Sequence, residues 1–177
     1  MSAPSGLLLD HEAAIRETES LGPCLDLACG RGRQALAVSL WGLPVIGVDR
    51  SSEALRALAG ARASEHLPIE LIRADLEAAP CLPVAEARFG CVLVFRYLHR
   101  PLASAIEKAL QPGGLLIYET FTTYQSVRPQ GPSNPHFLLE PGELPALFPR
   151  LTVEHHWEGD LKGEEMFAVA QLVARRD

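Results

Sequence analysis

The sequence predicts an α/β fold in which helices cover both faces of a doubly wound, mostly parallel sheet. Short apolar runs that indicate buried strands alternate with segments whose leucines recur at helical spacing. A glycine-rich turn follows the first apolar run, and two strand-like runs lie close together near the end of the chain. The chain has 177 residues, 47% of them hydrophobic, and is expected to form a single domain with a full core.

The parallel strands are expected where short apolar runs are bounded by proline, glycine or charged residues. They span residues 23–29, 44–49, 68–75, 89–97 and 115–121. The run FGCVLVFRY at 89–97 is the most strand-like, so we expect it at the centre of the sheet.

The helices are expected over residues 10–20, 33–43, 52–63, 101–110 and 143–148. Ser51 or Ser52 can cap the third of these, and Gly42 closes the second. Pro101 suits a first helical turn, and residues 112–114 (PGG) end that helix before the next strand. Strands and helices together predict five β/α alternations.

The chain changes in character after residue 121. Residues 122–142 are rich in proline and show little periodicity, and a long irregular segment in a compact domain usually has a functional role. We therefore expect it on the substrate side, with residues 1–20 as a helical lid segment. The runs 151–159 and 165–176 are joined by the turn-like GDLKGE, so these two strands must be antiparallel.

The composition argues against several classes of partner. The net charge is −6, and the only lysines are Lys108 and Lys162, so no basic surface for nucleic acid is expected. No apolar run is long enough for a membrane span, and the first residues lack the basic region of a signal peptide. The cysteines form no C-x-x-C pair, so the spacing typical of a zinc site is absent. Cys24 and Cys91 lie in apolar runs, and we expect reduced thiols in a cytoplasmic protein.

A metal site is not expected either. His155 and His156 are the obvious candidates for ligands, but neighbouring residues on a strand face opposite ways and cannot chelate one ion together.

Ligands bind to sheets of this kind at the carboxyl ends of the parallel strands. Those ends carry residues 26–32, Asp49, Asp75, residues 95–99 and residues 119–122. The sequence therefore predicts that these separate stretches meet at one edge of the sheet.

The first turn fits two nucleotide cofactors. Gly30, Gly32 and Ala35 match the dinucleotide fingerprint G-x-G-x-x-[GA], which would favour a nicotinamide dinucleotide. Asp26 argues otherwise, because its carboxylate would repel a pyrophosphate and attract the ammonium and sulfonium groups of S-adenosylmethionine. The structural alternative for Asp26 is that it ties the loop by accepting backbone N–H groups, which is compatible with ligand binding.

Two further acids are expected to contact a nucleoside. Asp49 can accept both ribose hydroxyls of either cofactor, or else cap the following helix. Asp75 can accept the exocyclic amine of adenine while Leu76 offers an apolar face, or else Asp75 only forms a turn.

Several motifs together resemble the class I S-adenosylmethionine-dependent methyltransferases. They are LDLACGRGR, Asp49, RADLE, VLVFRYLHRPL and LQPGGLLIYETF. The resemblance covers roughly residues 20–175, and within the class it is most similar to bacterial small-molecule methyltransferases of the tellurite-resistance type. It implies a Rossmann-like, seven-stranded sheet whose last strand is antiparallel. It also implies SN2 transfer of the methyl group from S-adenosylmethionine to a small molecule.

The residues expected to bind the cofactor lie on the strand ends and turns named above: Asp26, Ala28, Gly30, Gly32, Arg33, Asp49, Arg50, Asp75, Leu76 and Phe95. The candidate catalytic residues follow the fourth strand. Arg96 would hold an anionic acceptor or form a salt bridge, and His99 would act as a general base or simply precede a helix. Tyr97 is the third candidate. Residues of the irregular segment that would join a lid, or else remain solvated, are Tyr124, Arg128 and His136.

Two other functions remain open at this stage. An NAD-dependent oxidoreductase would use the same glycine turn, although Asp26 and the terminal hairpin argue against it. The chain would alternatively be a non-catalytic S-adenosylmethionine-binding module that works with a partner.

Overall fold

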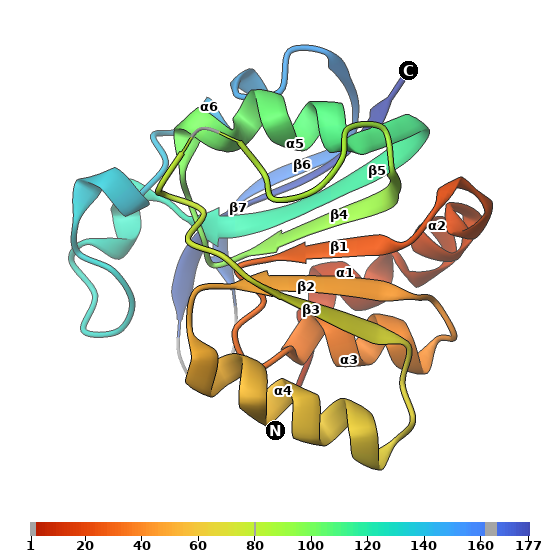
Figure 1. Cartoon of the computed structure of the whole chain (residues 1–177). Coiled ribbons are helices and arrows are strands. Elements are labelled where there is room, and N and C mark those ends of the chain that lie inside the picture. Colours follow the sequence, from red (N-terminus) through yellow and green to blue (C-terminus); the bar gives the residue numbers. More distant parts are fainter. Residues whose placement is uncertain (1–2, 80, 162–165) are drawn as a thin grey trace.

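The computed structural model describes residues 3–79, 81–161 and 166–177, and within these the strands form one seven-stranded sheet (Figure 1). The strand order is β3-β2-β1-β4-β5-β7-β6. The strands are β1 (Cys24–Leu27), β2 (Val45–Asp49), β3 (Ile69–Arg73), β4 (Phe89–Phe95), β5 (Leu110–Phe121), β6 (Leu151–Leu161) and β7 (Phe167–Arg176).

The strand directions confirm the predicted sheet. Neighbours among β1 to β5 pair in parallel, whereas β7 pairs antiparallel with both β5 and β6. The most apolar run, β4, is buried along its whole length and lies at the middle of the strand order, as expected. Of the predicted turn at 159–164, residues 159–161 belong to β6, and the rest lies outside the described residues.

The helices and 3-10 turns connect these strands. They are α1 (Gly6–Asp10), α2 (Glu12–Glu17), η1 (Glu19–Leu21), α3 (Arg33–Leu40), α4 (Ser52–Ser64), η2 (Arg100–Leu102), α5 (Ala103–Ala109), η3 (Thr123–Gln125), η4 (Pro135–Phe137) and α6 (Glu143–Ala146). Figure 1 shows α5 on one side of the sheet and α3 and α4 on the other.

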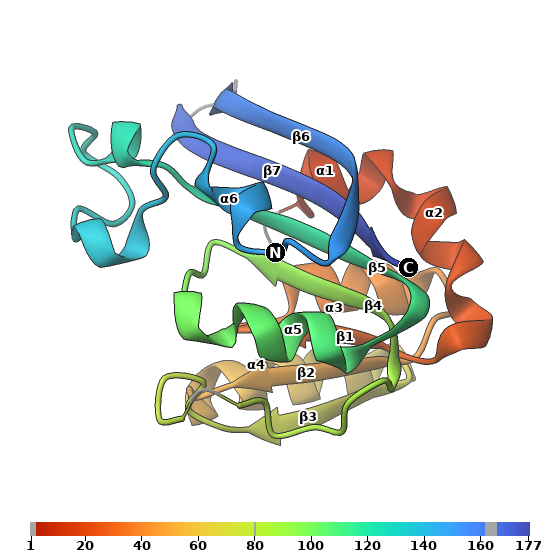
Figure 2. The same ribbon diagram turned by 90° about the horizontal axis from the view of Figure 1, so that it is seen from above.

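Two apolar clusters form the core, one on each face of the sheet. Leu102 and Ile106 of the η2–α5 segment pack on one face together with Leu144 of α6. Leu36 of α3 and Leu58 of α4 pack on the opposite face. Burial on both faces explains why the central strands are almost continuously apolar. Figure 2 shows the same layers from above.

Three expectations about individual elements are wrong. No helix separates β3 from β4 among the described residues of that connection, so the five predicted β/α alternations are not all present. Strand β5 begins at Leu110 rather than at 115 and includes residues 112–114, because the pairing with β4 shifts register between Phe89 and Cys91 and tolerates the proline there.

The third incorrect expectation concerns the N-terminal segment. The single helix expected over 10–20 is two short helices that meet at His11, whose backbone is not helical (φ −113°, ψ 17°). Leu7, Leu8 and Ile15 are buried in the cluster that also holds α3 and α4, and this packing extends the helical segment toward the start of the chain. In the part of the chain that is described, no helix has the length and apolar character needed to cross a membrane.

The turn after β1 has a left-handed backbone. Gly30 and Gly32 have φ values of 55° and 80°, and Ala28 also has a positive φ of 53°. A Cβ atom on Gly32 would lie 2.3 Å from the Leu58 side chain of α4. Gly32 is thus required both by the backbone conformation and by the close approach of α4.

We expect the substitution Gly32→Ala to lower the free energy of unfolding by about 1–2 kcal/mol, because alanine is strained at positive φ and meets Leu58. Urea unfolding measures the change. Gly60→Ala is the matched control. Gly60 lies within α4 with open space around it, so alanine there should raise the free energy of unfolding by about 0.5–1 kcal/mol. Unchanged stability of Gly32→Ala would contradict the requirement for glycine.

Candidate active site

A cavity of about 230 Å³ lies at the carboxyl ends of the parallel strands. Its lining contains many of the predicted site residues: Ala28, Asp49, Arg50, Asp75, Leu76 and Tyr97. It also contains Ala74, Glu77 and Phe137, which the sequence analysis did not select. Ala74 and Glu77 flank a predicted residue, whereas no local pattern pointed to Phe137.

Asp49 joins two turns of the site. Its Oδ2 accepts a hydrogen bond from the Gly30 N–H at 2.8 Å, and its Oδ1 accepts one from the Ser51 N–H at 2.8 Å. The cap of α4 is Ser51, whose hydroxyl accepts from the Ala54 N–H, so the helix-cap alternative for Asp49 is wrong. Each carboxylate oxygen keeps a free lone pair, with which Asp49 can accept a hydroxyl donor from a ligand.

Polar groups gather at the Asp75 end of the cavity. Asp75 Oδ1 accepts from the Glu77 N–H at 3.0 Å, so the turn-forming role of Asp75 is real. The Tyr97 hydroxyl is buried and has no hydrogen-bond partner among the described residues. Burial raises the pKa of Tyr97 to about 12, and the nearby Glu77 and Asp75 carboxylates add to the increase. Asp75, Glu77 and Tyr97 thus line a cavity whose walls include the apolar Leu76.

Asp26 lies in the core beneath the glycine turn and is not among the residues that line the cavity. Its Oδ2 accepts from the Ala35 N–H of α3 at 3.1 Å, so the structural alternative for this residue is realised. Burial raises the pKa of Asp26 to about 7, the Ala35 N–H lowers it, and the Asp49 charge raises it further. The carboxyl group is consequently poised to respond to a neighbouring cation.

Arg33, the first residue of α3, lies among charged groups from several strands. Burial and the nearby Arg96 guanidinium lower its pKa, while the Glu119 and Asp26 carboxylates oppose this decrease. These charged residues follow or end β1, β4 and β5, so the predicted convergence of strand ends is observed.

Glu119 is a buried acid that the sequence analysis assigned to this edge without a role. Its Oε2 accepts hydrogen bonds from the Ser5 hydroxyl at 3.0 Å and from Gln171 Nε2 at 2.7 Å. The Ser5 N–H also donates to Gln34 Oε1 at 3.1 Å. The N-terminal segment is therefore bonded to β5, and through Gln34 to α3. A charged residue inside the apolar run LLIYETF was the sequence feature that could have indicated a buried, hydrogen-bonded role for Glu119.

Arg96 has a positive φ of 56°, which is uncommon for a residue with a side chain. Its guanidinium lies 4.5 Å from the centroid of the Phe167 ring and 5.9 Å from that of Phe121. The backbone N–H of Arg96 donates to the Glu119 backbone carbonyl at 2.8 Å. No salt bridge joins Arg96 to a carboxylate in the described ranges, and the exposed guanidinium is held on aromatic rings instead.

The three candidate catalytic residues do not form one cluster. Tyr97 lines the cavity, Arg96 lies over the aromatic pair, and His99 precedes η2, where its carbonyl accepts from the Leu102 N–H. The helix-preceding alternative for His99 is thus realised. Phe95 is buried in the core with α3 and α4 and does not line the cavity.

The irregular segment 122–142 is tied to the rest of the domain. Gln125 accepts from the Ala168 N–H at 2.8 Å, and Arg128 donates to Asp160 at 2.6 Å and to the Met166 carbonyl at 2.6 Å. Tyr124 is exposed, whereas the His136 carbonyl accepts from Arg100 at 3.0 Å. These contacts hold the start of the segment against β6 and the start of β7, and its later part against Arg100.

Comparison with known proteins agrees with this geometry. Residues 24–114 match the family described as "Methyltransferase domain". The probable S-adenosyl-L-methionine-dependent methyltransferase TehB of Haemophilus influenzae is 30% identical over 103 residues, which are 57% of this chain and 36% of that protein. Hemagglutinin 1 of Eikenella corrodens is 37% identical over 115 residues, 62% of this chain and 38% of its own.

A solved structure also resembles the fold of the whole chain. The crystal structure of TehB from Haemophilus influenzae superimposes with a TM-score of 0.78 at 18% identity, covering 100% of this chain and 64% of that one. The chain spans little more than a third of the length of the two curated relatives. The chain belongs to the class I S-adenosylmethionine-dependent methyltransferases, a family that takes its methyl group from S-adenosylmethionine.

Proposed function

We propose that the protein transfers the methyl group of S-adenosylmethionine to a small-molecule acceptor by direct SN2 displacement. The observation that carries this proposal is the cavity in which Asp49, Asp75 and Tyr97 meet beside the glycine turn. This is the place in a doubly wound sheet where a nucleoside ligand binds.

Different residues would bind the ribose, the adenine and the methionine part of the donor. Asp49 would accept the ribose hydroxyls, and Asp75, Glu77 and Tyr97 would bond the edge of adenine, with Leu76 against its face. Asp26 and Arg33, close to Gly30 and Gly32, would favour the ammonium and carboxylate of the methionine part. Of the remaining donor-binding residues predicted from the sequence, Ala28 and Arg50 line the cavity, whereas Phe95 packs in the core.

Methyl transfer forms a bond from the acceptor to the methyl carbon while the bond from carbon to the sulfonium sulfur breaks. The sulfonium charge disappears, so the protein gains most by aligning the reactants and excluding water. A soft nucleophile needs no general base, whereas an oxygen or nitrogen acceptor must lose its proton to one. Arg96, exposed on Phe167 and Phe121, would orient an anionic acceptor, and His99 is the residue available as a base.

One observation favours a second candidate, a donor-binding module completed by a partner. Tyr124, Val127 and Met166 are exposed apolar side chains on the acceptor side, and the contact between Arg128 and the Met166 carbonyl brings them near one another. A partner that covered them would supply the remainder of the acceptor pocket. The NAD alternative is not supported, because the chain belongs to a family that uses S-adenosylmethionine.

Thermal unfolding with S-adenosylhomocysteine, with NAD and without ligand tests the donor. Ligand at about 100 times its Kd adds about 2.7 kcal/mol of stability. We expect stabilisation by S-adenosylhomocysteine alone. Methyl transfer from S-adenosylmethionine to a panel of thiols, oxyanions, amines and carboxylates then tests the acceptor. If the isolated chain binds the donor but transfers no methyl group to any acceptor of the panel, the result favours the donor-binding module that a partner completes.

We expect Asp49→Ala to weaken S-adenosylhomocysteine binding by more than about tenfold, equivalent to about 1.4 kcal/mol, because it removes the hydroxyl acceptor and frees Gly30. Isothermal calorimetry measures this change. Glu86→Gln is the matched control, since it removes a charge that pairs with Lys108 outside the site. Equal affinity of a folded Asp49→Ala protein and the wild type would refute the role of Asp49.

We expect the affinity for S-adenosylmethionine to rise as the pH increases from about 5.5 to about 7.5. The pKa of Asp26 is raised to about 7, so its carboxyl group is neutral below that pH and attracts cations only above it. Affinity should fall by up to about tenfold per pH unit below 7. In the unliganded protein the sign is opposite: stability falls as the pH rises from 3.8 to about 7, because the unfolded carboxylate is ionised in this range and must take up a proton when the chain folds.

Asp26→Asn is the control for this pH dependence. Its side-chain oxygen can still accept from the Ala35 N–H, but the side chain no longer titrates. The variant should bind S-adenosylmethionine weakly and with a flatter pH profile, as calorimetry at several pH values would report. The same pH dependence in the variant would exclude Asp26 as its source.

A further inference from the structure

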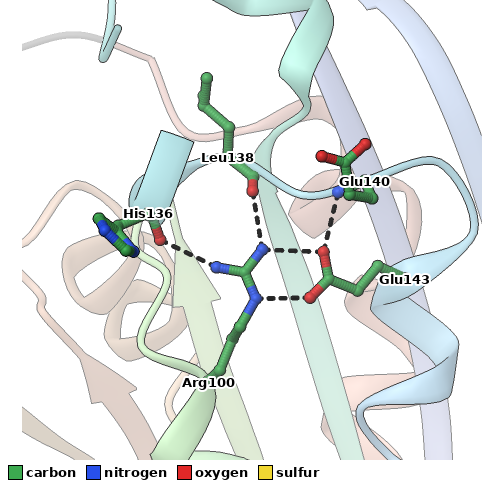
Figure 3. Close-up of polar contacts among 5 residues, drawn as sticks. All are labelled: Arg100, His136, Leu138, Glu140 and Glu143. Atoms are coloured by element: carbon green, nitrogen blue, oxygen red, sulfur yellow. Dashed lines mark hydrogen bonds and ion pairs between the residues drawn. The ribbon is translucent and has the colours of Figure 1, made fainter. Parts of the chain in front are cut away.

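Arg100 is the centre of a set of hydrogen bonds to His136, Leu138 and Glu143 (Figure 3). Its Nε donates to Glu143 Oε1 at 2.5 Å, and its Nη2 donates to Glu143 Oε2 at 2.8 Å. The same guanidinium donates to the His136 carbonyl at 3.0 Å and to the Leu138 carbonyl at 2.8 Å. A residue that follows β4 thus holds the chain segment 136–143.

Phe137 lies between the two carbonyl groups that Arg100 binds. Its side chain lines the donor cavity and is 41% exposed, whereas Leu138 and Leu139 next to it are buried. The Leu139 N–H donates to the Phe121 carbonyl at 2.9 Å, which anchors the segment to the end of β5. Phe137 is therefore the side chain of this stretch that faces the cavity, and Arg100 grips the backbone on both sides of it.

The ion pair in this set remains charged over the ordinary pH range. Glu143 raises the pKa of Arg100 through its hydrogen bonds, and Arg100 lowers the pKa of Glu143 in the same way. Glu143 Oε2 also accepts from the Glu140 N–H at 2.8 Å. The side chains of Arg100 and Glu143 are only 35% and 22% exposed, so water competes less than at an open surface.

A second residue of the cavity lining, Tyr97, lies close to Arg100 along the chain. Tyr97 lines the cavity three positions before Arg100 along the chain, and its carbonyl accepts from the buried Tyr118 hydroxyl at 3.0 Å. Arg100 thus links the segment that carries Tyr97 to the segment that carries Phe137. The hydrogen bonds of Arg100 therefore join two stretches of the chain that both contribute a side chain to the cavity lining.

We infer that Arg100 is a positioning residue for methyl-donor binding: it holds η4 so that Phe137 forms the outer wall of the donor cavity. This inference rests on the proposed function, in which the donor occupies that cavity. A donor that packs on Phe137 would bury the exposed part of the ring, and Arg100 keeps the ring in place before the donor arrives.

A double-mutant cycle on S-adenosylhomocysteine affinity tests the inference. By calorimetry, Arg100→Ala and Phe137→Ala should each weaken binding by about tenfold. Because Arg100 acts through Phe137, the double variant should be little weaker than either single variant. A purely structural role for Arg100 would lower stability without this coupling, so urea unfolding of each variant is measured alongside.

The chain contains a matched control for Arg100. Arg175 also bonds both oxygens of a glutamate, Glu154, at 2.5 and 3.3 Å, and it donates to the Gly113 carbonyl at 2.8 Å. Neither Arg175 nor its partners line the donor cavity. Arg175→Ala should lower stability while leaving the affinity for S-adenosylhomocysteine unchanged.

Glu143→Gln provides a second route if Arg100→Ala does not fold. It keeps an acceptor for the Glu140 N–H but removes the charge that orients Arg100, so a smaller loss of affinity is expected, again absent in the Phe137→Ala background. Additive effects of Arg100→Ala and Phe137→Ala, or wild-type affinity of Arg100→Ala and Glu143→Gln, would overturn the inference. Absence of wild-type binding would instead overturn the proposed function, and the inference with it.

Discussion

The Asp49 carboxylate, with one oxygen on the Gly30 N–H and the other on the Ser51 N–H, is the interaction on which the site depends. It joins the turn after β1 to the turn after β2, so two parallel strands end in one rigid edge. Gly30 and Gly32 adopt left-handed backbone conformations there, and α4 packs closely against Gly32. The same carboxylate retains acceptor capacity toward the cavity, so one group both builds the site and faces its ligand.

The edge of the sheet has two chemically different sides. Acids dominate one side, where Asp49, Asp75 and Glu77 line the cavity. On the other side, Arg96 lies over aromatic rings and close enough to Arg33 to lower the pKa of Arg33. This separation suits a reaction in which a cationic donor meets a nucleophile, because each side attracts the partner of opposite charge.

The structure also shows how remote segments complete this edge. The Ser5 hydroxyl bonds Glu119 at the end of β5, and Arg100 holds the stretch that carries Phe137. Both contacts join the ends of central strands to segments that lack strong periodicity. The irregular segments therefore belong to the architecture of the site, and Arg100 satisfies two backbone carbonyl groups of one of them.

The sheet, its parallel strands, the terminal hairpin and the acids at the carboxyl edge could all be predicted from the sequence alone. These depend on local pattern: an apolar run marks a buried strand, and an acid directly after it must lie at the carboxyl edge. The sequence analysis failed where local pattern does not decide the outcome. Strand β5 began earlier than its apolar run, and the connection between β3 and β4 contained no described helix.

Contacts between distant side chains could not be predicted from the sequence and are seen in the folded structure alone. Arg100 and Glu143 are 43 positions apart, and Ser5 and Glu119 are 114 apart. No periodicity in the sequence relates such positions, because their contacts arise from how loops pack on a finished sheet. For the same reason the structure separated Arg96 from Tyr97. Adjacent residues at the end of a strand point to different sides, and only packing shows which side holds the donor cavity.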